Sequence, residues 1–327
     1  MWKLYLLKSL IILTGSYSIT AQILLMREFL VLFSGNELSI GIIFACWFCG
    51  ISAGSALGGY VIEKIKDYWM AFFGSLILMS IILPVVVCFI RQLRTIFSVS
   101  SGEFIPLLYI LTGTICVIFP LTCSTGFFFP AACKIISGMS RETPSIQTGN
   151  VYGLEAVGSL AGGIIFTFIL VYVLNPFAII FLYMCLLSIN CFILAIVIDR
   201  TMSAKYLRTV FFIVFIISGI LLFLSDGINK FFINKRWESF SSLKLVETAD
   251  SQYQNLALGR ADEQYSLYIN GEYTSSFPDE YGSSLETHFI MSEHSDPKKI
   301  LLIGGGAEGM IGIILKYPVE RLDYIEL

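Results

Sequence analysis

The sequence contains little charge for its length. Of its 327 residues 14% are charged and 56% are hydrophobic, and the mean hydropathy is +0.79. Soluble domains carry about 25% charged residues, so the shortage of charge excludes a wholly soluble chain. The net charge of −3 and the lack of a basic stripe also argue against a nucleic-acid partner.

Histidine is scarce, and this limits the chemistry that we expect. His288 and His294 are the two histidines, and no further ligands stand near them at metal-binding spacing. All eight cysteines fall within the first 225 residues. Cys46 and Cys49 form a C-x-x-C pair, but within an apolar span we interpret them as small packing residues. The sequence therefore predicts no metal cofactor.

Long apolar runs fill residues 1–225, which we predict to be an α-helical multi-span membrane domain. A helical span needs about 20 apolar residues. The expected partner is a lipid bilayer, the cell (inner) membrane, which the chain crosses several times. The fourth span contains Pro120 and Pro130 and is expected to be kinked or broken. Seven segments qualify as spans: 5–33, 38–62, 69–90, 105–136, 151–173, 175–198 and 207–225.

Small residues recur at four-residue spacing within two of these spans. Gly50, Gly54 and Gly58 follow this spacing in the second span, and Gly158 and Gly162 follow it in the fifth. Such positions let helices approach closely in lipid, where packing drives helix association. We interpret them as helix-packing sites, with a substrate path as the alternative.

Ionisable residues inside spans are costly and mark candidate sites. Arg27 and Glu28 lie in the first span, and Glu155 lies in the fifth. Adjacent side chains diverge by about 100° on a helix, so Arg27 and Glu28 are expected to find separate partners. For Glu155 two interpretations stay open: a functional carboxylate, or a buried polar contact with Asn150 or Tyr152.

The distribution of basic residues bears on orientation. The positive-inside rule makes the side that carries most of them cytoplasmic, with Arg91 and Arg94 as exceptions. Seven spans would then place residues after 226 outside, whereas a nucleotide-type co-substrate is found inside. We expect a cytoplasmic soluble domain, and either a miscounted span or an unusual topology stays open. The residues on the basic side are Lys3, Lys8, Lys64, Lys66, Lys134, Arg141, Arg200, Lys205 and Arg208.

Residues 226–242 mix charge and aromatic side chains and are predicted to be a linker at the membrane surface. Lys230, Lys235 and Arg236 are expected to touch anionic lipid headgroups.

Residues 243–295 alternate in polarity and are predicted to form a small antiparallel β-hairpin domain followed by a helix. Asn270–Gly271 is a strong two-residue hairpin signal, because both residue types tolerate positive φ. Asp279 precedes a predicted helix over 280–293, where a carboxylate is favourable near the helix N-terminus.

Residues 296–327 are predicted to begin a Rossmann-like α/β domain. An apolar strand leads into Gly304, and Gly306 and Gly309 complete G-x-G-x-x-G spacing. Glycines allow the backbone to turn sharply and approach a ligand. Glu326 follows about 20 residues later, at the tip of a second strand, where a carboxylate can accept hydrogen bonds from ribose hydroxyls.

Several segments share motifs with one enzyme family. ETADSQYQNLAL (247–258) resembles its opening strand, LYINGEYTSSFPDEY (267–281) its hairpin, and KKILLIGGGAEG (298–309) its glycine loop. ILKYPVERLDYIEL (314–327) is similar to the strand that follows, and GNVYGLEAVGSLAGG (149–163) to a membrane span found in fused bacterial members. The family is that of the polyamine aminopropyltransferases, or spermidine synthases, which have a class I S-adenosylmethionine-dependent transferase fold.

The resemblance implies transfer of an aminopropyl group from decarboxylated S-adenosylmethionine to putrescine or another small amine. It implies donor contacts at Gln254, Gly304, Gly305, Gly306, Gly309 and Glu326. Weaker candidates for substrate contacts are Asp279, Glu280 and Glu308. An oligomer is possible within this family.

The chain also departs from the family pattern. Ala307 stands where an aspartate holds the donor ammonium group, and Thr274 stands where a hairpin glutamine is expected. Ser283 and Ser284 replace the pair that lines the amine pocket, and Asn270 replaces an aspartate. The residues expected to bind the amine therefore differ from the family pattern more than those expected to bind the nucleoside of the donor.

The family's catalytic aspartate belongs to a D-x-x-D-P loop that does not occur here. We therefore expect no catalytic residue within this sequence, and we interpret the chain as a truncated or partial product. Two alternatives stay open. The soluble part is an S-adenosyl-nucleoside-binding methyltransferase or sensor, or the chain is a polyamine transporter-like membrane protein in which Glu155 pairs with a cationic amine.

Overall fold

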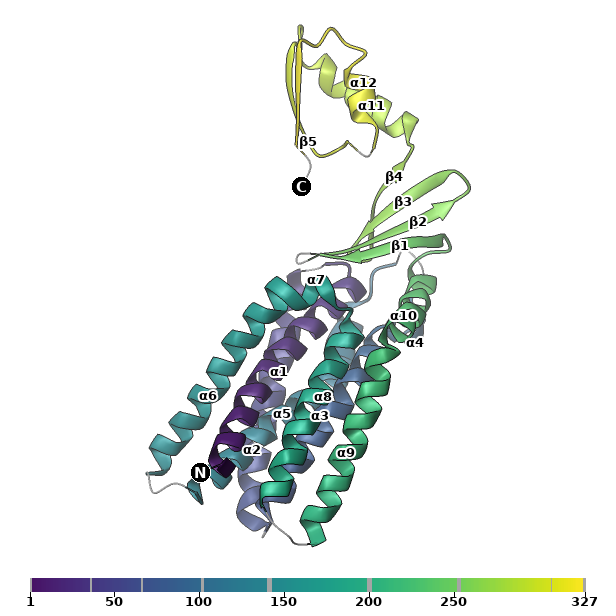
Figure 1. The fold of residues 1–327 in the computed structure, drawn as a ribbon. Coiled ribbons are helices and arrows are strands. Elements are labelled where there is room, and N and C mark those ends of the chain that lie inside the picture. The colour runs from purple at the N-terminus through teal and green to yellow at the C-terminus, as the bar shows by residue number, and fades with distance from the viewer. Residues whose placement is uncertain are drawn as a thin grey trace.

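The protein is a bundle of long helices with a small sheet at one end, seen here in a computed structural model (Figure 1). The N-terminus lies at the opposite end of the bundle from the sheet. A further pair of strands with two helices lies beyond the sheet. The structure describes residues 2–35, 37–65, 67–100, 103–139, 143–198, 202–251, 254–306 and 308–325.

Within these residues, seven helices are long and apolar enough to cross a membrane, as the sequence predicts. The break expected in the fourth span does not occur, because α5 continues through Pro120 and Pro130 as one helix. Neighbouring helices and side chains make proline tolerable in a membrane helix. The helices are α1 (Trp2–Leu32), α2 (Glu37–Lys64), α3 (Tyr68–Ile90), α4 (Leu93–Ile96), α5 (Leu107–Ser137), α6 (Pro144–Ile165) with a π-helical turn η1 (Phe166–Leu170), α7 (Val171–Val173), α8 (Pro176–Ile198), α9 (Met202–Phe223) and α10 (Ser225–Phe240).

Glycines bring two pairs of helices into close contact. In the α1–α6 pair, Gly158 faces the backbone carbonyl of Ile12, and a Cβ at Gly158 would collide with that oxygen. In the α2–α5 pair, Gly54 faces the carbonyl of Cys123 in the same manner. The small-residue spacing therefore corresponds to helix packing, the first interpretation given above.

The small sheet has four antiparallel strands in the order β1 (Lys244–Asp250), β2 (Asn255–Ala261), β3 (Gln264–Ile269) and β4 (Glu272–Phe277). The turn between β3 and β4 consists of Asn270 and Gly271, with φ of 49° and 79°, so the predicted two-residue hairpin is confirmed.

A helix, α11 (Glu280–Ser292), follows the sheet. Asp279 caps it: its Oδ1 accepts a hydrogen bond from the Gly282 N–H at 2.9 Å. This satisfies one of the backbone donors left free at a helix N-terminus. The predicted start of the helix is confirmed.

Two parallel strands, β5 (Lys299–Ile303) and β6 (Arg321–Ile325), are joined through the short helix α12 (Met310–Ile314). The register pairs Lys299 with Arg321 and Ile303 with Ile325. Parallel strands normally have both faces covered, yet Leu301 and Ile303 are more than half exposed. The strand–helix–strand order is the one that the sequence predicts for residues 296–327.

The segment predicted as a surface linker is largely the helix α10, which leads from α9 into the sheet (Figure 1). Trp237 and Phe240 of α10 are buried, and the Trp237 indole N–H donates to the Leu243 carbonyl at 2.7 Å. The Trp237 ring also packs edge-on against Tyr268 of β3, with 5.0 Å between ring centroids. The sheet is therefore attached to the bundle through α10.

The α1–α6 contact generates a first prediction. Gly158→Ala should lower the free energy of unfolding by about 1–3 kcal/mol, because its Cβ collides with a backbone carbonyl that cannot easily move. Gly153→Ala on the same helix is the matched control, since nothing lies within 4 Å of its Cβ position. This control should be neutral or stabilising by up to about 1 kcal/mol. Thermal unfolding of the two variants in detergent measures the difference, and equal midpoints would contradict the prediction.

Candidate functional site

The glycine turn after β5 adopts a backbone that L side chains rarely accept. Gly304 and Gly305 both have φ of 76°, and Gly309 has φ of 97°. The Cβ position of Gly304 is open, with nothing within 4 Å, whereas that of Gly306 is filled by the Tyr324 ring. One side of the turn is therefore packed against β6, and the Gly304 side leaves room for a ligand.

Two contacts hold this turn in place. The Gly304 N–H donates to the Ile325 carbonyl of β6 at 2.9 Å, which extends the parallel pairing into the turn. The Ser283 hydroxyl of α11 donates to the Glu308 carbonyl. The turn is therefore braced from β6 on one side and from α11 on the other.

The acidic candidates differ in where they lie. Asp279 uses a carboxylate oxygen to cap α11, and Glu308 lies in the glycine turn itself, next to Gly309. Glu326 and the side chain of Glu280 lie outside the described residues, as does Ala307. The structure thus brings Glu308 and the four glycines together, and the ribose contact predicted for Glu326 stays a prediction.

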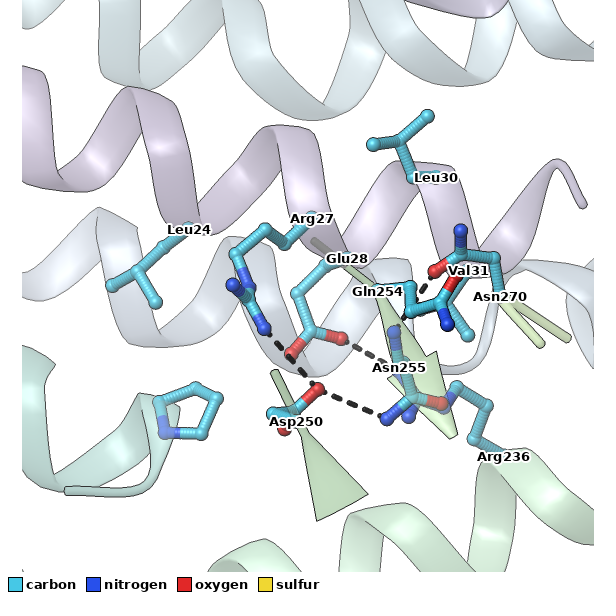
Figure 2. Close-up of a pocket in the computed structure, with 11 residues that line it drawn as sticks. Leu24, Arg27, Glu28, Leu30, Val31, Arg236, Asp250, Gln254, Asn255 and Asn270 are labelled. Atoms are coloured by element: carbon cyan, nitrogen blue, oxygen red, sulfur yellow. Dashed lines mark hydrogen bonds and ion pairs between the residues drawn. The ribbon is translucent and has the colours of Figure 1, made fainter. Parts of the chain in front are cut away.

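Gln254 lies elsewhere, at the junction of the sheet and the bundle (Figure 2). It lines a cavity of about 30 Å³ together with Arg27 and Glu28 of α1. A cavity of that size holds a water molecule or two, not a nucleoside. The glycine turn, between β5 and α12, instead lies beside the C-terminal end of β6 in the unit beyond the sheet (Figure 1). A donor contact at Gln254 therefore stays a prediction.

The junction is centred on Glu28, a buried carboxylate between two arginines. The Arg91 Nε donates to Glu28 Oε2 at 2.9 Å, and Arg91 Nη2 donates to Oε1 at 2.5 Å. Arg236 Nη1 of α10 donates to Oε2 at 2.9 Å. All three side chains are less than 10% exposed. Glu28 therefore ties α1 to the end of α3 and to α10.

Further contacts complete this network. Arg91 Nη1 donates to the Asn229 side-chain oxygen at 2.8 Å, and its guanidinium lies 5.1 Å from the Phe177 ring centroid. Burial lowers the pKa of the Arg236 guanidinium, and the nearby Glu28 carboxylate opposes that shift. A guanidinium keeps its proton in proteins, so the cluster carries two positive charges around one negative charge.

Arg27, next to Glu28 in sequence, points to the sheet instead (Figure 2). Its Nη2 donates to the Ser251 carbonyl at 2.7 Å and lies 3.5 Å from Asp250 Oδ1. Asp250 also accepts from the Asn255 side-chain amide at 3.0 Å. The prediction that Arg27 and Glu28 find separate partners is confirmed, and the pair serves to attach the sheet to α1.

Arg236 corrects an expectation from sequence. It was predicted to touch lipid headgroups with Lys230 and Lys235, but it is buried against Glu28. A charged stretch read along the chain does not show which of its cations faces a buried carboxylate. Glu28 inside an apolar helix is the signal that such a partner must exist.

Glu28→Gln should therefore lower the free energy of unfolding by about 3–5 kcal/mol, since it leaves two arginines buried without their carboxylate. Glu238→Gln is the matched control. Glu238 forms an exposed pair with Lys235 at 3.2 Å, worth about 0–1 kcal/mol. Thermal unfolding in detergent compares the two variants. A Glu28→Gln midpoint equal to that of the control would show that the network adds no stability.

Comparisons with known proteins point to one group of enzymes. The chain is 36% identical over 88 residues to the polyamine aminopropyltransferase of Caldicellulosiruptor bescii, covering 26% of this chain and 31% of that protein. It is 35% identical over 101 residues to that of Clostridium tetani, covering 28% and 34%. No family model and no solved structure matches the chain.

The chain thus spans about a third of the length of these curated relatives. Their names agree with the resemblance identified from the hairpin and glycine-loop motifs. The described part of the chain thus combines seven apolar helices of membrane-spanning length and a small antiparallel sheet with partial similarity to polyamine aminopropyltransferases.

Proposed function

We propose that this chain belongs to a membrane-bound, spermidine synthase-like enzyme that transfers an aminopropyl group from decarboxylated S-adenosylmethionine to putrescine or another small amine. The observation that carries the proposal is the glycine turn after β5, with positive φ at Gly304 and Gly305 and open space at Gly304. Partial similarity to enzymes named polyamine aminopropyltransferase supports it.

The proposed domain division follows from this function. Residues 1–225 anchor the protein in the membrane, residues 226–242 link this part to the sheet, and residues 243–295 form the sheet and α11. Residues 296–327 contribute the start of a Rossmann-like domain, for which the parallel β5–β6 pair joined by α12 is the support.

In the proposed reaction a neutral amine attacks the carbon next to the donor sulfonium. A C–N bond forms as the C–S bond breaks, the methylthio-nucleoside leaves, and the amine loses a proton. The task of the protein is to hold both molecules in line. Gly304, Gly305, Gly306 and Gly309 would let the backbone pass close to the donor, and Glu326 would accept hydrogen bonds from its ribose.

The amine half of the proposed site is less well supported. The Ser283 hydroxyl donates to the Glu308 carbonyl, so at a position where the family lines its amine pocket, this side chain braces the glycine turn. Asp279 caps α11. These observations favour an alternative, in which the soluble part binds an S-adenosyl nucleoside as a methyltransferase or a sensor.

Donor binding tests the proposal directly. In the full chain in detergent, Gly304→Ala should weaken the binding of decarboxylated S-adenosylmethionine by at least about tenfold, since the new methyl fills the open side of a turn at positive φ. Gly312→Ala is the control within α12, because nothing lies within 4 Å of its Cβ position. Equilibrium dialysis with labelled donor measures both variants.

The choice of nucleoside separates the alternatives. Preference for the decarboxylated donor over S-adenosylmethionine supports aminopropyl transfer, and the reverse preference supports the methyltransferase or sensor. If the protein receives the decarboxylated donor and putrescine but forms no spermidine, aminopropyl transfer is ruled out.

The soluble part is proposed to lie in the cytoplasm, where a nucleoside co-substrate is found. Seven spans place the sheet and the N-terminus on opposite sides. The excess of basic residues at the N-terminal end of the bundle argues against this orientation. That excess is smaller than it first appears, because α10 adds Lys230, Lys235 and Arg236 to Arg91 and Arg94 at the sheet end.

Thiol labelling of intact cells tests this orientation. A cysteine placed at Glu263, in the exposed turn between β2 and β3, should resist a membrane-impermeant maleimide until the cells are permeabilised. A cysteine placed at Lys3 should react in intact cells. The reverse pattern would place the sheet outside, and identical behaviour at both positions would contradict an odd number of spans. The cysteines already present in the spans provide the background level.

A further inference from the structure

A second cavity, of about 590 Å³, lies within the helix bundle, far from the glycine turn. Four helices line it: α1, α2, α5 and α6. Ligand pockets in proteins typically measure roughly 300–1,000 Å³, so this cavity has the volume for a small molecule. It is separate from the junction cavity that contains Gln254.

The position of the cavity follows from how the helices pair. Gly15 and Gly158 bring α1 and α6 into backbone contact, and Gly54 and Gly126 do the same for α2 and α5. Close contact within each pair leaves a seam between the pairs. The cavity occupies this seam near the middle of the spans, because Glu155 lies about midway along the Pro144–Val173 span.

Glu155 of α6 is the ionisable residue that lines this cavity. Its side chain is partly buried among the described residues that line the cavity. Among those residues no cation and no hydrogen-bond donor satisfies it. A carboxylate near the middle of a membrane span is costly without a partner. A cation bound in the cavity would provide that partner.

The rest of the lining fits an organic cation. Trp47 and Phe48 of α2 contribute aromatic rings to the lining, and an aromatic ring attracts an ammonium group that lies over its face. Gln22 of α1 and Ser55 of α2 add an amide oxygen and a hydroxyl oxygen that can accept N–H hydrogen bonds. The lining contains no lysine, arginine or histidine, so an anion would meet a carboxylate and no positive charge.

A metal ion fits less well. One carboxylate with an amide and hydroxyls falls short of the oxygen ligands that a hard divalent cation requires. No group of three metal-ligating side chains occurs among the described residues. Aromatic rings beside a single carboxylate instead suit a weakly hydrated ammonium with an apolar body.

We propose that this cavity is an intramembrane binding site for a molecule with a primary ammonium group, which pairs with Glu155. Phe48 and Tyr152, which are 59% and 67% exposed, form the rim, so the site opens at the bundle surface. The ammonium group comes either from a soluble amine or from the headgroup of an aminophospholipid. The inference does not depend on donor binding at the glycine turn.

Putrescine binding to the full chain in phosphatidylglycerol nanodiscs tests the proposal, because these lipids carry no ammonium headgroup. Wild type should bind labelled putrescine but not 1,4-butanediol, its neutral counterpart. Glu155→Gln should weaken putrescine binding by at least about tenfold, and Glu155→Asp should retain part of it. Glu63→Gln is the control, since Glu63 is an exposed carboxylate on α2 outside the cavity.

Equal unfolding midpoints of wild type and Glu155→Gln exclude misfolding as the cause of lost binding. If putrescine does not bind, but phosphatidylethanolamine purified with wild type is lost from Glu155→Gln, the site recognises a lipid ammonium. Putrescine binding that is unchanged by Glu155→Gln overturns the proposal. Failure of both amines to associate with wild type also overturns it. In each case the nucleoside assay at the glycine turn is unaffected.

Discussion

The arrangement of this protein depends on one buried carboxylate, Glu28, held between Arg91 and Arg236. A charge withdrawn from water must be paired, and here its partners come from the end of α3 and from α10. The helix that follows the last long apolar helix is thereby fixed to the first one. Arg27, one residue earlier and pointing about 100° away, reaches Asp250 and the sheet. One turn of α1 therefore positions both α10 and the sheet.

Different interactions hold the helix bundle together and attach the sheet to it. Within the bundle of apolar helices, close glycine contacts such as those of Gly54 and Gly158 bring helices together, which is the packing typical of helices in lipid. At the junction with the sheet, buried ion pairs and hydrogen bonds around Glu28 and Arg27 make the contacts instead. The seam between the two glycine-packed helix pairs has neither close glycine contacts nor ion pairs. The cavity that contains Glu155 lies in this seam.

Local sequence signals predicted local structure well. The long apolar helices, the Asn270–Gly271 hairpin and the helix that begins after Asp279 each depend on residues that are close in sequence, and the described residues form all three. Partners distant in sequence could not be predicted. Arg236 is 208 residues from Glu28, and nothing local distinguishes it from its lysine neighbours.

The same limit applies to the candidate sites. The glycine turn is a contiguous motif, so its backbone conformation could be anticipated from spacing. The location of Gln254 beside α1, and the gathering of Trp47 and Gln22 around Glu155, depend on how whole helices and the sheet pack together. The Glu155 carboxylate marked a candidate position in the sequence, but its surroundings required the fold.

The hairpin glycine has an evolutionary consequence. Gly271 is required by the turn, because its φ is 79°, and by the assembly, because any side chain there would strike the Val31 carbonyl and the Phe240 ring. A substitution at this position would be selected against twice, once for folding of the sheet and once for its seating on the bundle. Proteins that inherit this junction should therefore vary less at this position than a turn alone would require.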